Sequence, residues 1–177
     1  MIAWPSHVGA CGTTFDLKHL HPFAMPYELA ATEKHVGRSL TLHVGFGMHT
    51  FTRSIQAADD PKDYYSDRRE TRMFCRDRYA LSKQLPTIVS ELNRRPCRYA
   101  RAKSGIVNYV TIDLSGAGPY GVFFNVRRLL KVGPDAIELA VLSAYPFTPG
   151  KPDPTIGKVG FNVLIGHASR GTKPHPP

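Results

Sequence analysis

The sequence predicts an α+β domain in which an antiparallel β-sheet, a four-stranded meander plus an N-terminal strand, packs against two basic helices. Three observations predict this class: apolar residues alternate within residues 36–55, an arginine-rich amphipathic segment covers residues 68–95, and four segments rich in Val, Ile, Phe and Tyr follow Gly105. A period of two is typical of a strand with one buried face, whereas spacings of three and four are typical of a helix. Strand, helices and further strands in this order indicate an α+β fold.

The strand expected within residues 36–55 has two different faces. One face carries the apolar residues Leu40, Leu42, Val44, Phe46 and Met48, and the other carries Thr41, His43, Gly45, Gly47 and His49. The two glycines leave room for another group to lie against the sheet. A shorter strand is expected earlier, at residues 15–20.

Residues 68–95 have helical periodicity, because Phe74, Leu81, Leu85, Ile88, Val89 and Leu92 recur at spacings of three, four and seven. Pro86 cannot lie deep inside a helix without a cost in stability, so we expect a break within residues 82–86 and hence two helices. Strands are then expected at residues 108–114, 121–129, 137–145 and 159–166. The short connections at 116–119 and 133–135 favour an antiparallel meander.

The length of 177 residues suits one domain. We expect an N-terminal arm at residues 1–14, a single α+β domain at 15–168 and a C-terminal tail at 169–177, since Pro and Gly leave little to pack at either end. The chain has no apolar run of the roughly 18 residues that span a bilayer, so no membrane association is expected. It also starts without the features of a secretory signal. Three cysteines without close spacing argue against a disulfide framework or a zinc ribbon, and favour a cytoplasmic protein.

Positive charge is concentrated in the middle of the chain. The formal net charge is +9, and residues 68–103 contain eleven basic and three acidic residues. On a helix, Arg68, Arg72 and Arg76 would lie above one another with Arg69 beside them, and an anion would offset their repulsion. Arginine grips phosphate at two points, so the bias toward arginine favours RNA or another nucleic acid as partner. A solvated basic face, or a surface for an acidic protein partner, is the alternative.

Histidines and one tyrosine are the candidates for chemistry. His43 and His49 share a strand face, and His19 and His21 stand two residues apart; a zinc site is disfavoured because no carboxylate or cysteine has the usual ligand spacing. A general acid or base is the functional alternative to surface histidines, and His49 is preferred because it ends its strand. Tyr145 follows Ser143 at the polar end of another strand. No nucleophile elbow, phosphate loop or zinc-protease motif occurs, and no cofactor is expected.

Residues 141–146, Val-Leu-Ser-Ala-Tyr-Pro, resemble a late strand of the ribonuclease toxin superfamily that unites barnase, EndoU, colicin-type tRNases and RelE-type toxins. The resemblance implies N-terminal helices against a four-stranded antiparallel sheet, and metal-independent RNA cleavage through attack of the 2′-hydroxyl on the adjacent phosphate. The runs Arg72–Phe74, Arg78–Ser82 and Lys158–Phe161 also resemble mobile-element proteins labelled stationary-phase growth adaptation proteins.

The sequence therefore predicts a ribonuclease of toxin or phage-defence type. His49 would act as general base or acid, Arg72 would neutralise charge on the phosphorane, and Tyr145 would hold or protonate the leaving group. Nucleic-acid-binding residues would be Arg53, Arg68, Arg69, Arg76 and Arg78. A non-catalytic nucleic-acid-binding protein remains the alternative, as does an interaction protein that docks an acidic partner such as an antitoxin.

Overall fold

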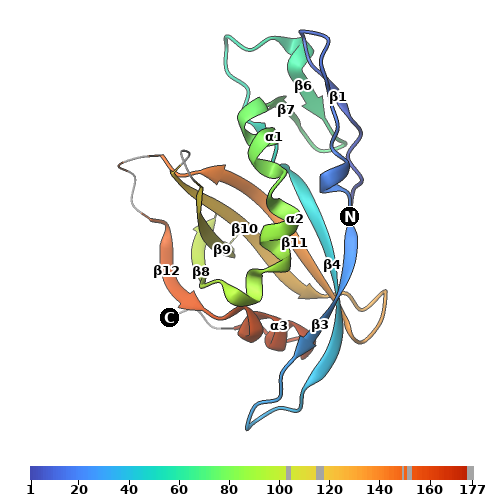
Figure 1. The fold of residues 1–177 in the computed structure, drawn as a ribbon, viewed down its shortest axis with the longest axis vertical. Coiled ribbons are helices and arrows are strands. Elements are labelled where there is room, and N and C mark those ends of the chain that lie inside the picture. Colours follow the sequence, from blue (N-terminus) through green and yellow to red (C-terminus); the bar gives the residue numbers. More distant parts are fainter. Residues whose placement is uncertain (103–104, 115–117, 149, 151–152, 175–177) are drawn as a thin grey trace.

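The computed structural model describes residues 1–102, 105–114, 118–148, 150 and 153–174. The molecule is elongated, with a large part built on one long sheet and a smaller part, containing β1, β6, β7 and α1, at one end (Figure 1). The chain passes from the large part to the small part at the end of β4.

The main sheet contains the strands β3 (Phe23–Leu29), β4 (Arg38–His49), β8 (Cys97–Ala102), β9 (Gly105–Leu114), β10 (Gly118–Arg128), β11 (Ala136–Pro146) and β12 (Thr155–Val159). Their order is β12-β8-β9-β10-β11-β4-β3. Neighbours are antiparallel except β11 and β4, which run parallel. Parallel neighbours need a long connection, and here residues 50–135, which include the first two helices and strands β8–β10, lie between them in the chain.

The smaller elements are two-residue strands β1 (His7–Val8), β2 (Thr14–Phe15) and β5 (Thr52–Arg53), the strands β6 (Tyr64–Ser66) and β7 (Thr71–Phe74), and the helices α1 (Arg76–Ser82), α2 (Leu85–Ser90) and α3 (Phe161–Ser169). Three 3-10 turns cover Lys18–Leu20, Pro61–Asp63 and Leu92–Arg94. Strands β5, β7 and β6 form a three-stranded sheet, and β1 pairs with β2.

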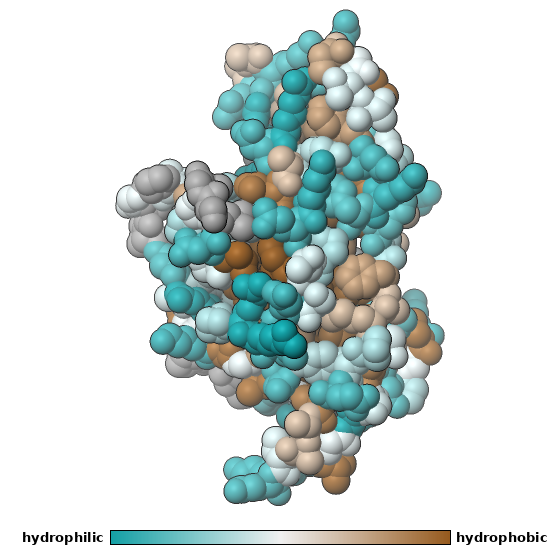
Figure 2. Space-filling model, in the orientation of Figure 1, coloured by the Kyte–Doolittle hydropathy of each residue, from teal (hydrophilic) through white to brown (hydrophobic). Residues whose placement is uncertain are grey.

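One face of the main sheet forms the hydrophobic core. The apolar residues of β4, among them Leu42 and Val44, pack with Leu139 of β11, Ile88 of α2 and Ile165 of α3 in a single buried cluster. Figure 2 shows that hydrophilic residues cover most of the surface in this orientation, with hydrophobic residues in small separate patches. The opposite face of the sheet carries a second, smaller cluster around Tyr109 and Phe123.

The predicted α+β class is correct, but the predicted sheet is not. The main sheet has seven strands in a mixed arrangement rather than a four-stranded meander plus one strand. Three of the expected meander strands correspond to β9, β10 and β11, and residues 36–55 contain β4 as expected. The glycine-rich turn expected at 116–119 lies partly outside the described residues.

Three predicted elements are wrong. The strand expected at residues 15–20 is absent beyond Phe15, because β2 is only Thr14–Phe15 and Lys18–Leu20 is a 3-10 helix. Residues 159–166 are mostly helix, because Phe161, Leu164, Ile165 and Ala168 have helical spacing and bury one side of α3. Residues 71–74 form strand β7 instead of helix: Phe74 stacks on His7 at 4.4 Å between ring centres and packs on Phe51. The expected break before Pro86 is present, since α1 ends at Ser82 and α2 begins at Leu85.

The segment expected as an N-terminal arm is anchored to the rest of the protein at Trp4 and His7, while residues 10–14 are exposed. Trp4 is buried, and its indole Nε1–H donates a hydrogen bond to the Phe46 carbonyl at 2.7 Å. His7 and Val8 pair with Phe15 and Thr14. At the other end, α3 continues to Ser169, and the last three residues of the expected tail lie outside the described part. In the described chain no helix is long and apolar enough to cross a membrane.

Candidate functional site

A pocket of about 620 Å³ opens on the face of the main sheet opposite α2 and α3. Phe123, Ser143 and Tyr145 contribute the sheet side of this pocket. Arg69 and Glu70, from the connection between β6 and β7, form another side. His49 and Arg101 also line it, at the ends of β4 and β8. We call it the site pocket.

A β-bulge shapes the sheet side of the site pocket. On β10, Phe123 pairs with Ser143 and the next residue, Phe124, pairs with Val141, so Leu142 is an extra residue on β11. The bulge lets two consecutive side chains, Leu142 and Ser143, line the same pocket. Ser143 in turn is the register partner of His49 on the parallel strand β4. The two strands thus bring together residues separated by most of the chain.

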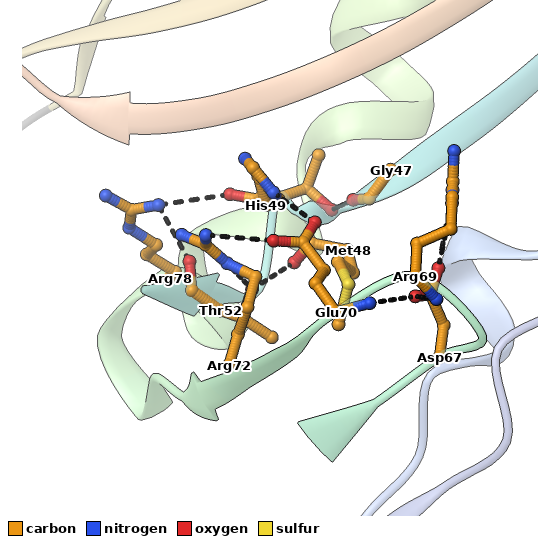
Figure 3. Close-up of polar contacts among 10 residues, drawn as sticks. Gly47, Met48, His49, Thr52, Asp67, Arg69, Glu70, Arg72 and Arg78 are labelled. Atoms are coloured by element: carbon orange, nitrogen blue, oxygen red, sulfur yellow. Dashed lines mark hydrogen bonds and ion pairs between the residues drawn. The ribbon is translucent and has the colours of Figure 1, made fainter. Parts of the chain in front are cut away.

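His49 is held by a carboxylate. Its Nε2 lies 2.6 Å from Glu70 Oε1, and the other oxygen of Glu70 accepts a hydrogen bond from Arg72 Nη1 at 3.3 Å. Arg72 Nε also donates to the Thr52 hydroxyl at 3.0 Å. Figure 3 shows Glu70 between the His49 ring and the Arg72 guanidinium. The three side chains form a His–Glu–Arg chain at the edge of the site pocket.

The charges around Glu70 keep it ionised. Partial burial by itself would raise the pKa of Glu70, but the hydrogen bond with His49, the charge of His49 and the guanidinium of Arg72 together lower it below its usual value. An ionised carboxylate orients the imidazole and stabilises its protonated form. This arrangement suits a histidine that accepts a proton during a reaction.

A tight turn places Glu70 and the arginines before it. Asp67 Oδ1 accepts hydrogen bonds from the backbone N–H groups of Arg69 at 2.7 Å and Glu70 at 3.0 Å. Such bonds are typical of an aspartate that begins a turn. Arg68 and Arg69 therefore lie exposed at the turn, while Glu70 points toward His49 (Figure 3).

Arg78 connects the end of β4 with Tyr145. Its Nη1 donates to the backbone carbonyls of His49 at 3.1 Å and Thr52 at 2.7 Å. The guanidinium carbon also lies 5.2 Å from the centre of the Tyr145 ring, a cation–π contact. Arg78 therefore holds the turn after His49 against the strand that carries Tyr145.

Tyr145 belongs to a row of stacked rings on three neighbouring strands. Its ring centre lies 5.2 Å from that of Phe123, which lies 5.1 Å from that of Tyr109, with interplanar angles below 20°. Burial raises the pKa of the Tyr145 phenol, and the nearby charge of Arg78 only partly opposes this. The phenol is consequently protonated at neutral pH and can donate a proton or a hydrogen bond.

The structure brings five of the eight predicted site residues together. His49, Arg69 and Tyr145 line the site pocket, and Arg72 and Arg78 hold its residues in place. The other three are elsewhere. Arg53 is paired with Asp59 at 2.5 Å, Arg68 lines an adjoining pocket, and Arg76 donates to Cys11 Sγ at 3.1 Å in the small part.

The predicted stack of Arg68, Arg72 and Arg76 on one helix face is wrong. Arg68 lies in the turn before β7, Arg72 lies within β7, and Arg76 is the first residue of α1. Several arginines are also occupied by carboxylates: Arg53 by Asp59, Arg72 by Glu70, Arg95 by Glu91 and Arg98 by Asp153. The positive charge of these residues is thus distributed over several elements, and part of it is paired with carboxylates.

Sequence reasoning missed Glu70 and Arg101 as site residues. Both were visible only as members of the charged segment, and no local motif distinguishes them. Glu70 is 21 residues from His49, and only the three-stranded sheet brings it to the end of β4. Within the described part, no cluster of three or more His, Cys, Asp or Glu residues could hold a metal ion. His19 and His21 contact Ser82 and the Trp4 carbonyl instead.

The fold and the site define a class, an α+β protein with a histidine–carboxylate pair beside an aromatic pocket on the free face of a mixed sheet. A family model described as the YjaZ family matches residues 7–169, and the chain belongs to this family. Neither the curated proteins nor the solved structures contain a match.

Proposed function

We propose that the protein is a metal-independent ribonuclease that cleaves RNA through attack of the 2′-hydroxyl on the adjacent phosphate. The observation that carries the proposal is the arrangement of His49, Glu70 and Tyr145 around one pocket with Arg69 and Arg101. The site pocket has a volume of about 620 Å³, which is within the usual range for small-molecule sites, so the pocket can accept a nucleotide.

In the proposed reaction, His49 takes the proton from the 2′-hydroxyl while the 2′-oxygen forms a bond to phosphorus. The bond from phosphorus to the 5′-oxygen breaks, and the Tyr145 phenol gives its proton to that oxygen. The products are a 2′,3′-cyclic phosphate and a free 5′-hydroxyl. The His49 imidazolium then releases its proton to solvent and the Tyr145 phenolate takes one up, so both groups return to their starting states; the raised pKa of the phenol favours its protonated form.

The remaining residues of the site position His49 and stabilise the charges that form during the reaction. Ionised Glu70 orients His49 and stabilises the imidazolium, and Arg72 holds Glu70 through its ion pair at 3.3 Å. Since Arg72 is engaged by Glu70 and Thr52, its role here is to position the carboxylate. Arg69 and Arg101, which line the site pocket, stabilise the negative charge that develops on the phosphate.

The test is cleavage of total RNA by the purified protein in the presence of EDTA. We expect His49→Ala to reduce the rate by roughly 10²- to 10⁴-fold, the usual contribution of a general acid or base. His43→Ala is the matched control, because His43 lies on the same face of β4 but does not line the site pocket. Absence of cleavage by the unaltered protein, or equal rates for the two variants, would exclude the proposal.

A non-catalytic nucleic-acid-binding protein is the second candidate. Exposed Arg68, Arg94 and Arg101 favour it, because within the described residues none of them is paired with a carboxylate. This candidate predicts salt-sensitive RNA binding that His49→Ala leaves unchanged, without cleavage. An acidic protein partner, such as an antitoxin, would compete with RNA for the same arginines.

A further inference from the structure

The geometry points to a longer groove, of which the site pocket is one end, that binds a single-stranded stretch of RNA across the free face of the sheet. Arg101 lies at the site end, Arg69 in the middle and Arg68 at the far end. This inference rests on the proposed function, because it takes RNA as the ligand. It adds a second phosphate-binding position at Arg68, away from the reacting bond.

Three adjoining pockets make up the groove. Beside the site pocket lies a second of about 370 Å³, and beyond it a third of about 670 Å³. Gly47 and Leu142 line both the first and the second, while Ile2 and Trp4 line both the second and the third. Arg69 lines all three, so the three cavities meet around this side chain.

In the middle of the groove, the β4 backbone is partly exposed at Gly47, whereas the Met1 side chain covers Gly45, which is buried. A Cβ atom at Gly47 would lie 2.8 Å from the Leu142 carbonyl oxygen, so only glycine fits against the β11 backbone there. At Gly45 a Cβ would contact the Met1 side chain at 2.7 Å. The N-terminal segment forms the wall beside this backbone, and the hydrogen bond from Trp4 to Phe46 anchors it.

The charges along the groove favour a polyanion. Its carboxylates are each held by an arginine: Asp67 by Arg69, Glu70 by Arg72 and Glu138 by Arg127. The Arg69 side chain is still 77% exposed. Among the described residues Arg68 and Arg101 have no carboxylate partner, and they line opposite ends of the groove. Separate cations along a groove suit successive phosphates better than one phosphate.

The site end favours an unpaired base over a duplex. Phe123, Leu142 and Tyr145 offer an apolar and aromatic surface on which a base can pack, and Ser143 beside them offers a hydroxyl. Bases in a duplex are stacked and paired, so they cannot reach such a surface, whereas those of a single strand can.

The experiment measures binding separately from cleavage. Fluorescein-labelled RNA with 2′-fluoro groups has no 2′-hydroxyl to attack, so its affinity for the full-length protein can be measured by anisotropy. Two mixed-sequence probes are compared, a dinucleotide and an oligonucleotide of about eight nucleotides, which is within the usual range for single-strand sites.

We expect Arg68→Ala to weaken binding of the longer probe by about 3- to 10-fold and to leave the dinucleotide unchanged. For the longer probe, the slope of the logarithm of the binding constant against the logarithm of the salt concentration should become less steep by about 0.7. This is the value for the loss of one phosphate contact to a single strand. Arg101→Ala should weaken both probes. Arg94→Ala is the matched control and should weaken neither, because Arg94 is exposed but lines none of the three pockets.

The inference fails if Arg68→Ala affects both probes equally or neither, if neither probe binds, or if a duplex of the longer sequence binds as tightly as the single strand. The outcomes for the groove and for the proposed function are distinguishable. Length-dependent binding without cleavage of ordinary RNA would leave the groove in place and exclude the ribonuclease.

Discussion

The two faces of the main sheet are built from the same strands but differ in how much of their side-chain surface is buried. On β11, Leu139 and Val141 point into the core and are almost fully buried, whereas Leu142 on the other face is 36% exposed and lines two pockets. On β4, buried apolar residues alternate with threonine, histidine and glycine in the same way. One face therefore forms the main core, and the other, which buries only the smaller cluster around Tyr109 and Phe123, presents Leu142, Ser143 and Tyr145 to the site pocket.

The largest expected effect compares two leucines of β11. Leu139→Ala should lower the free energy of unfolding by about 2–5 kcal/mol, because it removes a fully buried side chain and leaves a cavity. Leu142→Ala should lower it by less than about 1 kcal/mol, since this side chain is already partly in water. Urea unfolding followed by circular dichroism measures both. Equal losses would show that the free face is as important for stability as the core.

A smaller effect separates two glycines on the free face of β4. Gly47→Ala should destabilise the protein by about 1–3 kcal/mol, because the added Cβ would meet the β11 backbone at Leu142. Gly45→Ala should have a much smaller effect, because its Cβ meets the flexible Met1 side chain, which can move. Thermal unfolding of the two variants checks this, and a more destabilising Gly45→Ala would contradict the described course of the N-terminal segment.

The smallest effect concerns the protonation of Glu70. In His49→Gln, the pKa of Glu70 should rise, because the hydrogen bond and the charge of His49 both lower it. Since the folded-state pKa lies below the usual value, the pair stabilises the fold at neutral pH, and this contribution is lost as the pH falls below about 4.5.

Carbon-13 NMR of the side-chain carboxyl groups measures the pKa of Glu70 directly. Asp59 is the internal control: its pKa is lowered mainly by the hydrogen bond from Arg53, which is independent of His49. An unchanged pKa of Glu70 in His49→Gln would contradict the His–Glu pair.

Local patterns predicted the parts of the fold in which one strand or helix has a consistent face. The alternation in residues 40–48 correctly placed Leu42 in the core and His49 on the other side, because the side-chain period of a strand requires it. The strand prediction for residues 159–166 is wrong because an eight-residue segment with Val, Phe and Ile fits a strand as well as a helix. The helix prediction for residues 71–74 is wrong because their strand partners, β5 and β6, lie before the segment with helical spacing.

The candidate site was predictable only in part, because some of its residues have a local sequence feature and others do not. His49 and Tyr145 each stand at the polar end of an alternating strand, and this local feature identifies them. Glu70 has no such feature, and its contact with His49 depends on how the three-stranded sheet folds back onto β4.

The amino-acid sequence by itself determined the fold class, the buried face of β4 and the excess of positive charge, because periodicity and composition are properties of short segments. Only the tertiary structure decided which arginines are occupied by carboxylates, that β11 runs parallel to β4, and that Glu70 holds His49. The pairing of β11 with β4 and the contact of Glu70 with His49 join residues far apart in the chain, and periodicity within a short segment carries no information about such contacts.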